Sequence, residues 1–402
     1  MKSIRNHFLF LKLILLWSIA FIAIAYALSK SDFKSQSNDS KYYAEQVVRY
    51  YDKSWQEIIT PKWGENYWGF DPNTYMRDQF PGQLIIGATG AKLGLTPKHA
   101  QHIIQMFFQL GSIFLLFFVA RKFIAEEHSF ILFLGLLLIS NAFSYNLRAN
   151  HESGITFFSC LSLYAGLSFI DRKLIAFLFY VIASIFLLLI KGPFVIFAFI
   201  LFNLGAFFSL MKDFKNHHKF AFIAWGILFN LAAVMAAALV LWWYEVAFTA
   251  ITKLSFLEEF YRIQFKERAL DVKDQYPYFI QRGLNFFYYF YHTLTYALPW
   301  TIGLLIALYL RIKKQKKLSF VHSHLSYLLI LSAMAFCAVF STSNRMAGRY
   351  VYPAYYIVAA WMILFCYFNF EFMQRWLKKS LNNYYIYLVV GLWSLSFIIK
   401  LF

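Results

Sequence analysis

Residues 174–211 read LIAFLFYVIASIFLLLIKGPFVIFAFILFNLGAFFSLM, and Lys191 is the only charged side chain among them. A helix needs about 20 mostly apolar residues to cross a bilayer, so this stretch is long enough for two spans. Because Gly and Pro interrupt helices, we expect the chain to break at Lys191-Gly192-Pro193, either as two short helices or as one broken hairpin. The stretch predicts a membrane protein.

The composition of the whole chain supports the same class. Of its 402 residues, 60% are hydrophobic and 14% are charged, whereas soluble domains typically carry about 25% charged residues. The three cysteines, Cys160, Cys337 and Cys366, all lie in apolar runs, so we expect neither a disulfide framework nor a zinc site. A soluble enzyme, a secreted disulfide scaffold and a disordered chain are excluded.

Eleven stretches are long and apolar enough to be transmembrane helices. They predict an all-α polytopic membrane fold in a single domain over residues 1–402, with no C-terminal soluble domain. The stretches are residues 8–28, 100–120, 129–147, 154–170, 174–190, 194–211, 220–248, 290–310, 325–341, 350–369 and 384–402.

The net charge of +18 would suggest nucleic-acid binding in a soluble chain, but here its distribution indicates topology. With the N-terminus inside, the inside segments hold 17 basic and five acidic side chains, an excess of 12 of the 18 units. This distribution follows the positive-inside rule. It predicts a multi-pass membrane protein with a cytoplasmic N-terminus, and no nucleic-acid partner. A cleaved signal peptide ending near Ala25-Tyr26-Ala27 is the alternative for the first span, and it would leave the later sidedness unchanged.

Two predicted outside loops are long, at residues 29–99 and 249–290. Connections above about 15 residues are usually functional or disordered, and these are too rich in aromatic residues for disorder. We therefore expect short interfacial helices in the first loop and an active face on the periplasmic or extracellular side.

Two outside carboxylates are candidate catalytic groups. Asp39 opens a stretch with helical spacing, so it is either an N-cap or a general base at the membrane surface, and both roles are compatible. Glu152 precedes the fourth predicted span. It is either a first-turn acid that favours the helix dipole or a second catalytic carboxylate.

Four outside cations are candidates for binding a lipid phosphate. Lys191 is either a snorkelling side chain at a span end or a point charge for phosphate. The guanidinium groups of Arg77, Arg345 and Arg349 suit bidentate phosphate recognition. The sequence contains no P-loop, GxSxG, HExxH or Rossmann fingerprint, so we expect the activated group to arrive through the membrane on a phosphate-headed lipid.

The order of these pieces resembles the polyprenyl-phosphate-dependent GT-C glycosyltransferases, specifically the superfamily of protein mannosyltransferases and lipid A aminoarabinose transferases. The similarity covers residues 8–370. Its matching positions are Asp39 with Tyr43-Ala44-Glu45, Phe80-Pro81, Glu152 with Thr156-Phe157-Phe158, Lys191-Gly192-Pro193, Pro299-Trp300 and Arg349-Tyr350-Val351-Tyr352-Pro353.

The resemblance implies a glycosyltransferase that uses a polyprenyl-phosphate sugar, such as an undecaprenyl-phosphate one, and inverts the anomeric centre. Its acceptor would be a lipid, glycan or protein. Asp39 would be the catalytic carboxylate, while Lys191 and Arg349 would neutralise the leaving phosphate.

The chain departs from the family at two positions. Ser40 stands where the family usually has Glu, and Phe80 stands where Lys normally precedes Pro. The lipid-phosphate lysine is therefore missing, and Arg77 is the candidate replacement.

Two other function classes stay open at this point. One is a transporter or flippase for a lipid-linked anionic substrate, although transporters usually show internal repeats and midplane charges. The other is a structural membrane subunit that docks a partner through its aromatic loops. No cofactor is assigned, and the sequence leaves open whether a divalent metal takes part.

Overall fold

The computed structural model describes residues 21–30, 38–64, 71–137, 148–212, 219–263, 276–313, 323–343 and 347–375, with the isolated positions 11, 14, 18, 391 and 395. Within these ranges all regular structure is helical, apart from one antiparallel bridge between Lys62 and Tyr75. The prediction of an all-α membrane fold is confirmed. The predicted last span, and parts of the first and third, lie outside the described residues.

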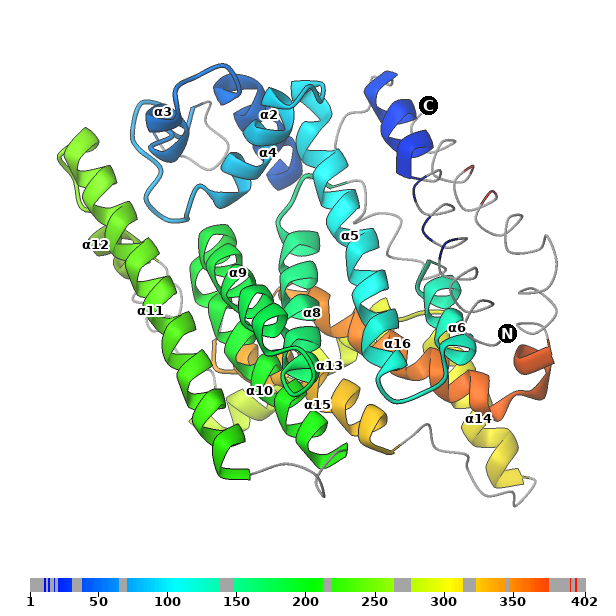
Figure 1. Ribbon diagram of the computed structural model, residues 1–402. Helices are drawn as coiled ribbons and strands as arrows, with labels where there is room; N and C mark the ends of the chain where they lie inside the picture. Colours follow the sequence, from blue (N-terminus) through cyan, green and yellow to red (C-terminus); the bar gives the residue numbers. More distant parts are fainter. Residues whose placement is uncertain are drawn as a thin grey trace.

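Short helices cover the upper end of the bundle in Figure 1. They are α2 (Asn38–Tyr50), α3 (Trp55–Ile59) and α4 (Gly82–Lys92). Val47, Ile58 and Leu84 pack into a small core of their own with Ala100 of α5. The described part of the first long loop is therefore folded into short helices, as the sequence predicts.

Longer helices form the bundle beneath this cap. Helix α8 packs against α5, α9 and α10, and α16 packs against α6, α14 and α15. Their bounds are α5 (Pro97–Arg121), α6 (Glu126–Leu137), α8 (Glu152–Ser168), α9 (Lys173–Lys191), α10 (Val195–Lys212), α14 (Trp300–Lys313), α15 (Ser323–Ser341) and α16 (Tyr352–Asn369).

Helices α9 and α10 form a hairpin at the Lys191-Gly192-Pro193 turn. Gly192 has a positive φ of 54°, a conformation that side chains other than hydrogen disfavour. Beyond the turn the chain folds back, because the ring of Tyr180 on α9 stacks on Phe202 of α10 at a centroid distance of 3.9 Å. The structure thus selects the hairpin from the two arrangements that the sequence leaves open.

Five described helical segments are long and apolar enough to cross a membrane, if Lys173–Met211 is counted as one segment. A sixth results if the bent pair of α13 (Tyr278–Tyr296) and α14 is counted as one span. The chain is a multi-pass membrane protein. The total of eleven spans stays a prediction.

The predicted span at residues 290–310 has the wrong bounds. The structure has α13 (Tyr278–Tyr296) and α14 (Trp300–Lys313), which meet at an angle of 93°. Pro299 lies at this break, where its missing N–H and its ring disrupt a continuous helix. The second loop is shorter than predicted, because α11 (Lys219–Thr252) extends into its start and α13 begins before its expected end. The loop also contains the short helix α12 (Phe256–Tyr261).

Candidate active site

An ion pair joins two segments that lie far apart in the sequence. Asp39 lies in the first turn of α2, and Arg349 lies in η3 (Gly348–Val351), directly before α16. Nη1 of Arg349 donates to Oδ2 of Asp39 across 310 positions of sequence. The Arg349 side chain is 34% exposed and that of Asp39 is 21% exposed, so a ligand can reach both partners.

The position of Asp39 corrects one alternative. Helix α2 begins at Asn38, so Asp39 is a residue of the first turn and does not occupy the N-cap position. A first-turn carboxylate still interacts favourably with the helix dipole. Its charged contact, however, is with Arg349, so the carboxylate is held between a helix start and a guanidinium.

Glu152 lies near Arg349 and Lys191. It is the first residue of α8, as the first-turn alternative predicted, and its side chain is buried. Nδ2 of Asn150 donates to Oε1 of Glu152 at 3.4 Å. Burial raises the pKa of the Glu152 carboxyl above its ordinary value, while the positive charges of Arg349 and Lys191 oppose that rise. The structure therefore brings Asp39, Glu152, Lys191 and Arg349 into one group, the charged cluster.

His151 is a neighbour of the charged cluster that the sequence analysis did not select. Its ring is buried and makes an edge contact with Tyr43 of α2, with centroids 5.9 Å apart. Burial and the charges of Lys191 and Arg349 hold the pKa of His151 well below its ordinary range. The only sequence signal was a histidine next to Glu152 in a short predicted loop.

These shifts leave the charged cluster suited to an anion. His151 is held neutral, and burial moves Glu152 toward its neutral form. Arg349 is paired with Asp39, and Lys191 and Arg349 both act electrostatically on Glu152 and His151. Lys and Arg are the side chains that bind a phosphate best, so the cations of the charged cluster suit an anionic ligand.

Three buried side chains fix the loop that carries His151 and Glu152. Oγ of Ser40 accepts a hydrogen bond from the Ala149 amide at 2.6 Å, and Nε2 of Gln83 donates to the Ala149 carbonyl at 2.7 Å. Oε1 of Gln105 accepts from the amide of Gly154 at 3.0 Å. Ser40, one of the two departures from the family pattern, thus connects α2 to the loop before α8.

Close backbone packing places the Lys191 turn. A Cβ at Gly82, the first residue of α4, would lie 2.3 Å from the carbonyl oxygen of Leu189 in α9. A Cβ at Gly192 would lie 2.6 Å from Phe260 and 3.3 Å from Phe80. Only glycine permits these approaches, so the start of α4 lies directly against the end of α9.

Phe80, the second departure, belongs to a group of aromatic side chains that we call the Phe80 cluster. Its ring centroid lies 4.7 Å from that of Phe256 and 5.0 Å from that of Phe260. The buried members of the cluster are Phe80, Tyr244, Phe248, Phe256 and Phe260. The position at which the family usually has a lysine is therefore packed among rings.

Arg77 lies beside α12. Its Nη1 donates to the carbonyl oxygen of Ser255, directly before α12, at 3.4 Å. A hydrogen bond from Arg262 lowers the pKa of Glu259, and the charges of Arg77 and Arg262 act in the same direction. Arg77 is thus placed next to the Phe80 cluster, and its role in phosphate binding stays a prediction. Arg345 lies outside the described residues.

In the part of the chain that the structure describes, no three His, Cys, Asp or Glu side chains are grouped closely enough to hold a metal ion. We therefore assign no metal ligand.

The helical bundle and its cap of short helices define the fold of this molecule. It is a polytopic membrane protein with the GT-C fold.

One solved structure with a similar fold is that of ArnT from Cupriavidus metallidurans. The TM-score is 0.57 for the apo state and 0.59 for the form bound to undecaprenyl phosphate, at 14% sequence identity. Each match covers 88% of this chain and 59% of the ArnT chain. The oligosaccharyltransferase from Archaeoglobus fulgidus in the apo form matches with a TM-score of 0.44 and 14% identity, over 96% of this chain and 55% of that one.

At these identities the likeness concerns the fold alone. No family model matches the chain, and no curated protein matches its sequence.

Proposed function

We propose that this chain is an integral-membrane glycosyltransferase. It transfers a sugar from a polyprenyl-phosphate donor to a lipid, glycan or protein acceptor, with inversion at the anomeric carbon. The reaction takes place on the periplasmic face of the bacterial inner membrane. The observation that carries the proposal is the charged cluster, which joins Asp39 and Glu152 to Lys191 and Arg349 within a GT-C fold.

Asp39 serves as the general base in this proposal. The acceptor hydroxyl oxygen attacks the anomeric carbon, and its proton passes to the Asp39 carboxylate. The bond between the anomeric carbon and the phosphate oxygen breaks, and its electron pair stays on the phosphate. The partial exposure of Asp39 supports this role, since an acceptor must reach the carboxylate.

Arg349 and Lys191 stabilise the leaving phosphate. Negative charge grows on the phosphate oxygen in the transition state, and fixed cations next to that oxygen lower the barrier. A guanidinium has five N–H donors, so Arg349 is able to hold Asp39 and a phosphate oxygen at the same time. The influence of both cations on buried Glu152 supports their closeness to one another.

Glu152 is the second carboxyl group of the proposed site. Burial favours its neutral form, in which it donates a hydrogen bond as well as accepting one. We assign it to the phosphate side of the reaction because its electrostatic partners are Arg349 and Lys191.

The choice of a polyprenyl phosphate as carrier rests on two observations. The charged cluster lies next to apolar helices, and such helices accommodate a lipid tail. ArnT, which shares the fold, has been solved with undecaprenyl phosphate bound.

The test uses the purified chain in vesicles with a radiolabelled polyprenyl-phosphate sugar. Asp39→Asn removes the base, and we expect transfer to fall by at least about 100-fold, the low end of general-base catalysis. Glu45→Gln is the matched control, because Glu45 is an ion-paired carboxylate on the same helix, bound to Lys41 and half-exposed. It should keep near-normal activity. Full activity in the Asp39→Asn variant would refute the catalytic assignment.

The same vesicles separate the enzyme from the transporter. A transferase releases polyprenyl phosphate and labels the acceptor. A flippase moves the intact donor across the membrane without releasing either product, and that result would replace the proposed function with the transporter alternative.

A further inference from the structure

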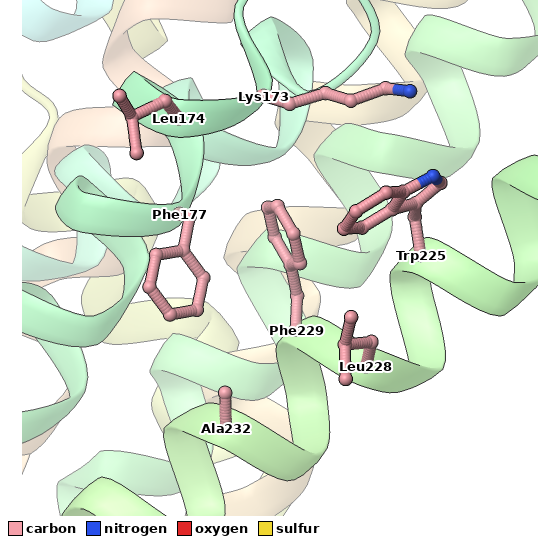
Figure 2. A pocket seen from close by; sticks show the side chains of 7 residues that line it. All are labelled: Lys173, Leu174, Phe177, Trp225, Leu228, Phe229 and Ala232. Atoms are coloured by element: carbon pink, nitrogen blue, oxygen red, sulfur yellow. The ribbon is translucent and has the colours of Figure 1, made fainter.

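A groove with a volume of about 450 Å³ lies between α9 and α11. Figure 2 shows its lining, which comes from the first turns of α9 and from the first half of α11. Phe177 and Phe229 form its floor, with their ring centroids 5.0 Å apart in an edge contact. The volume falls within the range of about 300–1,000 Å³ that is typical of ligand pockets.

The groove and the charged cluster lie at opposite ends of α9. The groove begins at Lys173 and the cluster includes Lys191, which are the first and last of the 19 residues of the helix. At about 1.5 Å per residue such a helix is about 28 Å long, close to the thickness of about 30 Å of the hydrocarbon core. The groove therefore lies in the leaflet opposite the charged cluster, away from the proposed donor phosphate.

The groove lies on the outer surface of the helical bundle. Leu174 is 71% exposed and Leu228 is 52% exposed. In the apolar window of α11, between Phe222 and Thr252, only 17% of the residues are buried. In a bilayer this surface contacts lipid tails, so an acyl chain is the ligand that matches the apolar floor.

The rim of the groove is basic. Nζ of Lys173 lies over the ring of Trp225, 5.1 Å from its centroid, and Figure 2 shows both side chains at one end of the groove. The neighbouring carboxylate of Asp171 is paired with Lys122 at 2.8 Å, so its charge is matched elsewhere. A basic rim above an apolar floor fits a lipid with a negative headgroup.

We propose that this groove binds one anionic phospholipid of the leaflet opposite the charged cluster. The acyl chain lies over Phe177 and Phe229 against Trp225, and the lipid phosphate lies on Lys173. This binding site is independent of the proposed glycosyl transfer, and its test measures lipid binding without any reaction.

Trp225 serves as the reporter in the test. Bromine atoms on an acyl chain quench the fluorescence of nearby tryptophans. The full-length protein is placed in vesicles that contain either brominated phosphatidylglycerol or brominated phosphatidylcholine at the same mole fraction. The emission of a Trp225→Phe variant is subtracted to isolate Trp225. We expect a preference of about fivefold for the anionic lipid, the magnitude of one basic side chain at an anionic membrane surface.

Two variants separate the headgroup from the chain. Lys173→Gln should reduce the preference to about one, and each variant is compared with itself in the two lipids, so a change in Trp225 emission cancels. Ala232→Phe fills the groove and should lower quenching by both lipids. Lys313→Gln is the matched control, because Lys313 lies over the ring of Tyr309 on α14, away from the groove, and it should leave the preference unchanged.

Equal quenching by the two lipids in the unmodified protein would overturn the proposal. So would a preference that survives in Lys173→Gln, since the anionic headgroup would then be bound elsewhere. Unchanged quenching in Ala232→Phe would show that the chain does not occupy the groove, which also overturns it.

Discussion

The charged cluster and the Phe80 cluster meet at the Lys191-Gly192 turn but are held together differently. In the charged cluster, side chains from distant segments meet through charge, and Asp39 and Arg349 stay partly exposed. In the Phe80 cluster, five buried rings pack against one another. The charged cluster is therefore open to a ligand, while the Phe80 cluster supports the turn that carries Lys191. In our proposal Lys191 and Arg349 bind the phosphate in place of the lysine that is missing at position 80. Arg77 hydrogen-bonds to Ser255 beside the Phe80 cluster, so we do not assign it to the phosphate.

The greatest loss of stability should come from a change in the Phe80 cluster, which supports the Lys191 turn. Phe80→Ala removes the ring that contacts Tyr244, Phe256 and Phe260, and losses of about 3–5 kcal/mol are typical for such core truncations. Chemical unfolding in detergent measures the change in the free energy of unfolding. Phe372→Ala is the control, because Phe372 is 66% exposed and should cost little. A loss below about 1 kcal/mol at Phe80 would mean that the rings do not carry the turn.

A smaller loss of stability is expected at Ser40, which fixes the loop that carries Glu152. Ser40→Ala removes the acceptor for the buried Ala149 amide, and an unsatisfied buried donor costs about 1–3 kcal/mol. The free energy of unfolding should fall by that amount.

Ser29→Ala is the matched control for Ser40. Its hydroxyl makes a local hydrogen bond to the Tyr26 carbonyl in an exposed position, so the expected change is within about 0.5 kcal/mol. Equal losses in the two variants would argue against an anchoring role for Ser40.

The smallest effect appears in the pH dependence of stability. Burial raises the pKa of Glu152 in the folded chain above its ordinary value of 4.5. The stabilising contribution of the protonated carboxyl is therefore full below about pH 4.5 and is lost as the pH rises through the folded-state pKa. Glu152→Gln lacks this titration. Relative to that variant, the unmodified protein should lose stability as the pH rises above 4.5, and chemical unfolding curves recorded at several pH values measure the loss. A constant difference would contradict the raised pKa.

The apolar runs allowed much of the fold to be predicted. They located α5, α8, α9 and α10 to within a few residues, because burial in a membrane requires continuous hydrophobic segments. The break at Pro299 was missed, since hydrophobicity continues across it. The proline was the available signal, and it was interpreted only as part of a family motif.

The candidate site was harder to predict than the fold. Asp39, Glu152, Lys191 and Arg349 were selected from residue type and order, but the pairing of Asp39 with Arg349 spans 310 positions, and no local pattern specifies it. His151 was missed because its burial depends on how Tyr43 of α2 packs over the loop before α8. The position of Arg77 beside Ser255 likewise depends on the fold of the second loop.

The proposed phosphate site is tested by measuring which cations bind the lipid phosphate. Binding of undecaprenyl phosphate to the purified protein is compared for Arg349→Gln, Lys191→Gln and Arg77→Gln, which all remove one positive charge. We expect the first two variants to weaken binding by at least about tenfold, since a hydrogen bond to a charged group contributes about 1.5–3 kcal/mol. Arg77→Gln should weaken it by less than about twofold, within the range of a surface charge. If Arg77→Gln abolished binding while Arg349→Gln and Lys191→Gln bound normally, the charged cluster would not be the phosphate site.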